Sequence, residues 1–285
     1  MEAFQKALDV GINFIDTAEI YGRGKSEELI AEAIRGHRED VVIGTKIWPW
    51  NLSYGRLKRA ADRSRQRLGV DVIDLYQIHW PNPFFPIRNT MKSMKRLVEA
   101  GKIRSVGVSN FNLTKMKSAQ ESLAPLDLAS NQVKYNLLDR GVELDLLPYA
   151  ETSGITIIAY SPLAFGLLTG RYKPETKPTS MVQTLNHRFS QKNLTRLGNL
   201  LLVISEIASE HNKTLSQVSL NYLICKPNVV AIPGAKRSDH VADSAGATDW
   251  RLTESEVSRL TSTASDLKFD KLSGIPNLLR TITYL

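Results

Sequence analysis

The sequence contains a single cysteine, Cys225, among 285 residues. One cysteine excludes an internal disulfide framework and a metal site built from several thiolates. No apolar run approaches the roughly 18 residues that a membrane-spanning helix needs. The opening stretch, MEAFQKALDVG, has neither the basic start nor the apolar core of a secretory signal peptide. We therefore expect a cytoplasmic protein without a membrane partner.

The chain has an excess of positive charge, with 37 Lys and Arg residues against 29 Asp and Glu residues. Such an excess favours an anionic partner, either nucleic acid or a phosphorylated cofactor. The basic residues occur in runs such as 56–59 and 92–96, which are typical of solvated helical surfaces. Because no nucleic-acid-binding motif accompanies them, we expect no nucleic-acid partner.

Short β-branched runs alternate with segments of helical periodicity along most of the chain. The predicted strands are 12–18, 41–46, 73–79, 103–110, 129–136, 156–161 and 229–234. The predicted helices are 2–10, 26–35, 54–68, 87–100, 113–121, 142–153, 199–211, 216–226 and one that opens at a Thr253–Glu256 capping box. Repeated βα units indicate a parallel sheet. A doubly wound sheet is disfavoured because no G-x-G-x-x-G turn follows the first strand.

The pattern predicts an α/β protein with a (β/α)₈ TIM barrel of seven recognisable strands, forming a single domain over residues 1–285. The chain opens on a predicted helix, so we expect the first barrel strand to be missing and the domain to be N-terminally shortened. Residues 165–197 show no clear periodicity and contain several glycines and prolines. A loop of that length is usually functional or disordered.

Titratable side chains stand where the predicted strands end. Asp16, Lys46 and His79 end three successive strands, and Tyr21 follows the first of them. The carboxyl ends of barrel strands meet at one rim, where catalytic groups lie, although a single polar strand end can simply face water. Only one histidine ends a strand, so we expect no metal. No G-x-S-x-G nucleophile motif is present.

The remaining chemistry for these four residues is proton donation to a carbonyl. A tyrosine has a pKa near 10, which is high for proton transfer at neutral pH. An ammonium about 4 Å away contributes about 4 kcal/mol at an effective dielectric of about 20. Lys46 is therefore expected to lower the pKa of Tyr21, while Asp16 orients Lys46 and His79 bonds the carbonyl oxygen. The protein offers no nucleophile, which points to hydride from a cofactor.

Seven stretches of the sequence resemble the aldo-keto reductase family. They are GINFIDTAEIYG (11–22), VVIGTK (41–46), LGVDVIDLYQIHWP (68–81), GKIRSVGVSNF (101–111), NQVKYN (131–136), AYSPLAFGLLTGRY (159–172) and IPGAK (232–236). The resemblance implies an NADP(H)-dependent barrel enzyme that reduces an aldehyde or ketone to an alcohol. It also implies a catalytic tetrad of Asp16, Tyr21, Lys46 and His79, with Tyr21 as the general acid.

The resemblance further implies three groups of cofactor contacts. The nicotinamide would be held by Ser109, Asn110 and Gln132 and stacked on Tyr160. The pyrophosphate loop would contain Ser161, Leu163 and Gly166, and the adenosine-phosphate segment Pro233, Gly234, Lys236, Arg237, His240 and Ser244. His240 and Ser244 differ from the family's usual residues, so NAD(H) stays an alternative cofactor.

Trp48 and Trp80 follow Lys46 and His79 closely and are expected to line an apolar substrate pocket. Two other functions compete with carbonyl reduction. The first is a non-catalytic or cofactor-sensing barrel, inactivated by the missing first strand. The second is an aldolase that uses Lys46 as a Schiff base, which requires a neutral amine and is disfavoured by Asp16. The sequence identifies neither the small-molecule substrate nor the oligomeric state.

Overall fold

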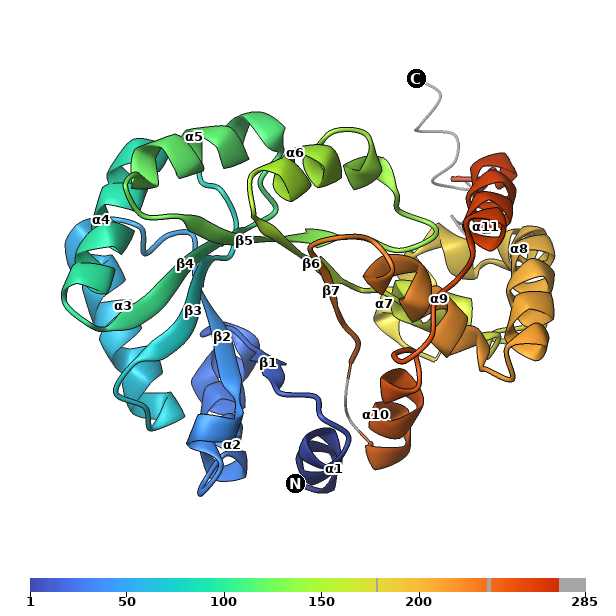
Figure 1. Ribbon diagram of the computed structural model, residues 1–285, viewed down its shortest axis with the longest axis horizontal. Helices are drawn as coiled ribbons and strands as arrows, with labels where there is room; N and C mark the ends of the chain where they lie inside the picture. The colour runs from blue at the N-terminus through green and yellow to red at the C-terminus, as the bar shows by residue number, and fades with distance from the viewer. Residues whose placement is uncertain (178, 235–236, 272–285) are drawn as a thin grey trace.

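The seven predicted strands form one parallel sheet whose order in space follows their order in the chain (Figure 1). The computed structural model describes residues 1–177, 179–234 and 237–271. The strands are β1 (Phe14–Asp16), β2 (Val42–Ile47), β3 (Ile73–Ile78), β4 (Ile103–Ser109), β5 (Leu128–Lys134), β6 (Thr156–Tyr160) and β7 (Val229–Ile232). The prediction of a barrel with seven strands is confirmed.

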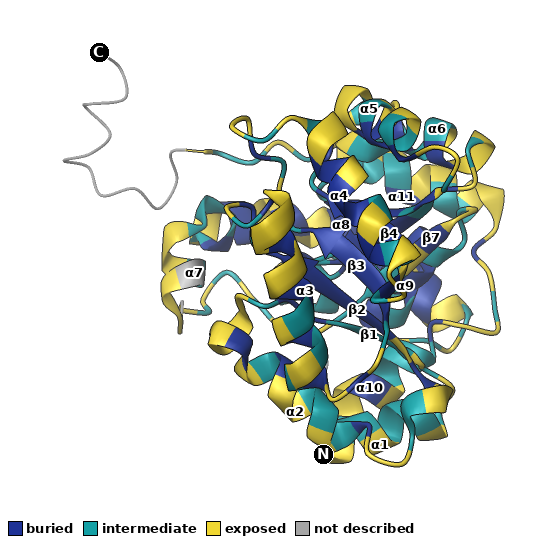
Figure 2. Ribbon diagram, turned by 90° about the vertical axis from the view of Figure 1, so that its left-hand side faces the viewer, coloured by how far each residue is buried: buried dark blue, intermediate teal, exposed yellow. Residues whose placement is uncertain are grey.

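Helices cover the outside of this curved sheet (Figure 1). The longer ones are α1 (Glu2–Asp9), α2 (Lys25–Ala33), α3 (Tyr54–Leu68), α4 (Ile87–Glu99), α5 (Leu113–Leu123), α6 (Leu146–Thr152), α8 (Gln191–Glu210), α9 (Leu215–Ile224), α10 (Ser238–Ala245) and α11 (Glu254–Asp266). Figure 2 shows their buried faces turned toward the strands and their exposed faces turned outward. Every residue of β3 is buried, as expected for a strand covered on both sides.

The barrel is nearly closed, with β1 and β7 at its two edges. Within the described part of the chain, β1 pairs only with β2 and β7 only with β6. Beside this seam α1 packs against α10, so helices from the two ends of the barrel meet where the strands do not (Figure 1). None of the described helices has the length and apolar character needed to cross a membrane.

The stretch 165–197 is more regular than the sequence predicts. It includes a 3₁₀ segment, η4 (Ala164–Thr169), the short helix α7 (Met181–Leu185), and η5 (His187–Phe189). Helix α8 starts at Gln191, where Ser190 accepts a hydrogen bond from the Asn193 amide. The expected helical start at residue 199 was therefore wrong. Leu194, Leu197 and Leu200 are buried in the first half of α8, but the polar residues between them obscure the helical periodicity in the sequence. The capping box at Thr253 and Glu256 is confirmed.

Candidate active site

A buried ion pair lies at the carboxyl end of the first two strands. Lys46, in β2, is fully buried, and its Nζ donates to Oδ2 of Asp16 at 2.5 Å and to the Thr17 carbonyl at 2.7 Å. Asp16 is the last residue of β1. An ammonium can be buried at this depth because a carboxylate and a carbonyl replace its water ligands.

Tyr21 and His79 lie beside this pair. The Tyr21 ring centroid is 5.3 Å from the Lys46 Nζ and 5.8 Å from the His79 ring, with the two rings nearly perpendicular. His79 follows directly after β3, and Tyr21 begins the 3₁₀ segment η1 (Tyr21–Gly24). Tyr21 is 43% exposed, so this cluster reaches the surface at the barrel rim. The four residues that the strand ends predicted are therefore brought together.

The electrostatics of the cluster differ from the prediction for Tyr21. Burial, followed by the negative charge of Asp16, raises the pKa of Tyr21 above its ordinary value of 10.0. The expected lowering by Lys46 was wrong for this site, because burial disfavours the charged phenolate and the Asp16 carboxylate adds its negative charge. Burial also lowers the pKa of Lys46, against the attraction of Asp16. Burial and the nearby Lys46 lower the pKa of His79 to about 4, so its imidazole is neutral at pH 7.

Two glutamine amides hold the other oxygen of Asp16. Gln77 Nε2 and Gln132 Nε2 donate to Asp16 Oδ1 at 3.2 Å and 2.8 Å. Gln132 was expected to contact the cofactor, whereas Gln77 was not singled out from the sequence. The signal in the sequence that could have identified Gln77 is a polar amide inside the strand β3, which is fully buried.

The residues expected at the nicotinamide form a hydrogen-bonded chain from β6 back to His79. Tyr160 OH donates to Asn110 Oδ1 at 3.1 Å, and Asn110 Nδ2 donates to the His79 carbonyl at 3.2 Å. Ser109 Oγ donates to the Gln132 carbonyl at 2.9 Å. Asn110 is therefore bonded to the backbone of His79, and Gln132 contacts the Asp16–Lys46 pair directly.

A groove of about 690 Å³ lies beyond β6 and β7 and collects most of the other expected cofactor residues. Those that line it are Ser161, Leu163, Gly166, Pro233, Gly234, His240 and Ser244. The sequence did not single out Phe165, Arg171 or Tyr172, which also line the groove. Arg237 is exposed and pairs with the Asp239 carboxylate, and Lys236 lies outside the described residues.

The loop after β6 has an unusual backbone. Ser161, Ala164 and Phe165 have φ between 49° and 58°, and Gly166 has a φ of 88°. A Cβ at Gly166 would lie 3.2 Å from the Tyr172 ring, so a side chain there would crowd the groove wall. Non-glycine residues in this region cost energy and gather at ligand-binding sites. The groove's volume and its mostly apolar lining with a few polar side chains fit an elongated nucleotide cofactor.

The expected substrate-pocket residues take different positions. Trp48 is half-buried, with its ring edge-on to His79 at 6.3 Å between centroids. Its backbone amide donates to Oε1 of Glu19 at 2.6 Å, so the loop after β2 is fixed to the loop that carries Tyr21. Trp80 is 48% exposed. Their lining of a substrate pocket stays a prediction.

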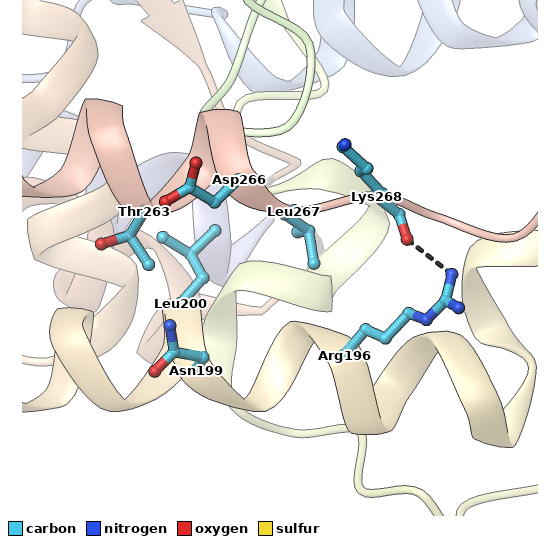
Figure 3. A pocket seen from close by; sticks show the side chains of 7 residues that line it. All are labelled: Arg196, Asn199, Leu200, Thr263, Asp266, Leu267 and Lys268. Carbon is cyan, nitrogen blue, oxygen red and sulfur yellow. Dashed lines mark hydrogen bonds between the residues drawn. The ribbon is translucent and has the colours of Figure 1, made fainter.

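A second cavity, of about 250 Å³, lies between α8 and α11 (Figure 3). Arg196 donates to the Lys268 carbonyl across it at 2.6 Å. None of the predicted site residues lines it, so it is separate from the candidate active site. No group of three His, Cys, Asp or Glu residues suited to a metal ion occurs in the part of the chain that the structure describes.

Comparisons with known proteins agree with the fold described above. The family model for the Aldo/keto reductase family matches residues 1–265. An uncharacterized oxidoreductase of Mycobacterium tuberculosis is 38% identical over 260 residues, covering 91% of this chain and 80% of the relative. The solved structure of an aldo-keto reductase from Klebsiella pneumoniae in complex with NADPH has 32% identity and a TM-score of 0.74, covering 96% of this chain and 84% of that one.

The glycerol dehydrogenase from Gluconobacter oxydans has a TM-score of 0.87 and 30% identity, covering 93% of this chain and 85% of its own. Its fold and that of the Klebsiella pneumoniae reductase follow this barrel along most of both chains. The sequence match, which extends from the first helix through nearly all of α11, and these structural likenesses agree on one assignment. This chain belongs to the aldo/keto reductase family, and it is an oxidoreductase enzyme.

Proposed function

We propose that this enzyme uses NADP(H) to reduce an aldehyde or ketone to an alcohol, with Tyr21 as the proton donor. Family membership and the NADPH-bound relative from Klebsiella pneumoniae support the cofactor and oxidoreduction of carbonyls. The observation that carries the mechanism is the buried Lys46–Asp16 pair beside Tyr21. A groove of cofactor size, lined by residues that follow β6 and β7, accompanies it.

The cofactor would extend from the barrel rim into the groove. Ser109, Asn110 and Gln132 offer hydroxyl and amide groups to the nicotinamide carboxamide, beside the Tyr160 ring. The loop with Ser161, Leu163 and Gly166 would hold the pyrophosphate, and residues 233–244 the adenosine end. When bound, NADPH supplies the hydride. The altered residues His240 and Ser244 keep NADH as a second candidate cofactor.

Tyr21 carries its proton at neutral pH, but its raised pKa makes the phenol a weaker acid, so loss of the proton needs assistance. Once the proton leaves, the phenolate lies beside the Lys46 ammonium, which stabilises the new negative charge. His79 is neutral because its pKa is lowered to about 4, so it donates a hydrogen bond rather than a proton. In this scheme Tyr21 supplies the proton and His79 orients the carbonyl oxygen.

The contacts of Lys46 argue against the aldolase alternative. A Schiff-base lysine reacts as a free amine, whereas the Lys46 Nζ donates to Asp16 and Thr17. Trapping of a carbonyl compound on Lys46 by borohydride, without any need for NADPH, would reverse this conclusion.

The direct test is NADPH oxidation with a panel of aldehydes and ketones, using the intact protein and its Tyr21→Phe variant. We expect turnover by the intact protein and a kcat about 10²- to 10⁴-fold lower in the variant. Quenching of protein fluorescence by NADPH should be equal in both. Binding of NADPH without turnover of any carbonyl would contradict the proposal and favour a cofactor-sensing barrel.

A further inference from the structure

Gln77 is a buried amide directly beside the Lys46–Asp16 pair. In the strand register, Gln77 of β3 is opposite Lys46 of β2 on one side and Gly107 of β4 on the other. Residues opposite each other in a parallel sheet point to the same face. Gln77 therefore extends into the barrel with Lys46, and its Nε2 donates to Asp16 Oδ1 at 3.2 Å.

The neighbouring strands leave room for this long side chain. A Cβ at Gly107 would lie 2.9 Å from Gln77 Cγ, closer than carbon atoms normally approach. A Cβ at Gly44 in β2 would lie 3.5 Å from Gln77 Nε2 and 3.1 Å from the Phe14 ring. Gly107 therefore provides space that Gln77 occupies, whereas a Cβ at Gly44 would be at ordinary contact distance from Gln77 and would crowd Phe14 instead.

Of the two polar atoms of the Gln77 amide, only Nε2 has a hydrogen-bond partner among the described residues. Gln77 Oε1 is buried and has no hydrogen-bond partner among the described residues, whereas its Nε2 reaches Asp16. A buried carbonyl without a donor costs stability, and a leucine or methionine would fill a similar volume without that cost. The contact with Asp16 is thus the physical gain that this amide provides.

Asp16 is held at both oxygens from three other strands. Its Oδ2 accepts from Lys46, and its Oδ1 accepts from Gln77 and from Gln132 of β5. Two amide dipoles at Oδ1 fix the rotation of the carboxylate and offset part of its charge. The titratable groups that face Asp16 and Tyr21 in this cluster are Lys46, His79 and Tyr160.

We propose that Gln77 is a positioning residue for proton donation by Tyr21: it anchors Oδ1 of Asp16, which keeps Oδ2 on Lys46 and limits how strongly Asp16 opposes loss of the Tyr21 proton. The role in catalysis rests on the proposed function above. The anchoring itself can be measured in protein without cofactor.

Two substitutions test the anchor. Gln77→Leu removes one of the two amide donors at Asp16 Oδ1 and leaves the Gln132 donor, so Asp16 is held less firmly. We expect kcat to fall about tenfold with KM for NADPH unchanged. Gln77→Glu places a second carboxyl beside Asp16, and such a pair shares a proton. While that proton is bound, the new carboxyl donates to Asp16 as the amide does, and activity should approach that of the intact protein. Once it is lost, kcat should fall.

The diagnostic result is therefore an added step in the pH profile of kcat, present in Gln77→Glu and absent from both the intact protein and Gln77→Leu. This step shows that a charge at position 77 reaches Tyr21. A purely structural role for Gln77 would leave the Tyr21 titration of Gln77→Leu unchanged. In cofactor-free protein, ultraviolet difference titration, with Tyr21→Phe as the blank, should show the pKa of Tyr21 raised by about one unit in the ionised Gln77→Glu variant.

Matched controls use Gln120, a half-buried glutamine on α5 that accepts a hydrogen bond from Tyr149 OH. Gln120→Leu and Gln120→Glu should change neither the kcat profile nor the titration of Tyr21. If Gln77→Glu does not fold, the kcat of Gln77→Leu and its Tyr21 titration decide the question. A Gln77→Leu variant with unchanged kcat and an unchanged Tyr21 titration would overturn the proposal.

The two proposals fail in different ways. If the intact protein reduces no carbonyl, the proposed function fails, while the Tyr21 titration still tests the anchor. If the intact protein is active and the Gln77 variants match it in both measurements, only the anchor fails.

Discussion

The barrel-rim cluster (Asp16, Tyr21, Lys46 and His79) and the groove beyond β6 and β7 are built by different means. In the cluster, side chains from three strand ends lie together, and the buried Lys46 ammonium donates to the Asp16 carboxylate and the Thr17 carbonyl. In the groove, the backbone takes positive φ angles after β6. Arg237, which lies in the chain between the groove residues Gly234 and His240, is exposed and pairs with Asp239.

This difference indicates that the cluster and the groove have separate roles, in catalysis and in cofactor binding. Buried, multiply bonded charges keep their positions when a substrate arrives, so they suit stabilisation of charge during a reaction. An exposed ion pair is screened by water and contributes little, so it suits loose, adjustable binding. We therefore expect changes in the cluster to lower kcat strongly and changes in the groove to weaken cofactor binding.

The largest effect is expected for Lys46→Met. The variant leaves the buried Asp16 carboxylate without its cation, which should cost about 3–5 kcal/mol of unfolding free energy. The kcat should fall about 10³-fold because the Tyr21 phenolate loses its neighbouring charge. Denaturant unfolding and NADPH oxidation measure the two effects. The double variant Lys46→Met/Asp16→Asn should regain stability but not activity. If Lys46→Met kept its activity, the expectation that changes in the cluster lower kcat strongly would be wrong.

A smaller effect is expected for His79→Gln, with kcat lowered about 10²-fold through the loss of an oriented donor. This variant should also change the pH dependence of stability. Because the pKa of His79 falls from 6.5 to about 4 on folding, the unfolded chain takes up this proton at a higher pH than the folded protein does. Stability is thus fully present above pH 6.5 and is lost as the pH falls toward 4. Denaturant midpoints should decline less in His79→Gln over this range; an equal decline would show that other groups are responsible.

In the groove, Gly166→Ala should weaken NADPH binding about tenfold and leave kcat at saturating cofactor near that of the intact protein, because the added methyl crowds Tyr172. Gly154→Ala is the matched control. Gly154 also has a positive φ, of 68°, but it lies outside the groove, and a methyl group there would meet no atom within 4 Å beyond its chain neighbours. Both variants should lose about 1–2 kcal/mol of stability. Equal NADPH affinity in the two, measured by fluorescence quenching, would argue against the groove as the cofactor site.

The smallest effect is expected for Arg237→Ala, with NADPH affinity reduced about twofold to fivefold and NADH affinity unchanged. Asp239 already pairs with this guanidinium, so a phosphate gains little from it. Asp239→Asn should act in the opposite direction and favour NADPH. A large loss of NADPH affinity in Arg237→Ala would show that the groove also relies on a strong, fixed charge.

The cluster could be predicted from the sequence because its residues follow strand ends. Asp16, Lys46 and His79 each mark the point where an apolar run stops, and parallel strands in sequence order bring such points together. Gln77 could not be predicted in this way, because it lies within the buried strand β3 rather than at the point where the strand ends. The pKa of Tyr21 was predicted in the wrong direction, since the sequence gives neither the depth of burial nor the pairing of Lys46 with Asp16.

Local patterning by itself determined the seven strands, most of the helices and the set of four side chains at the barrel rim, because periodicity and strand ends depend on neighbouring residues. Only the tertiary structure decided which oxygen of Asp16 meets Lys46, how the loop after β6 bends and where α8 begins. Those features depend on burial and on contacts between distant segments, and no short stretch of sequence encodes either one.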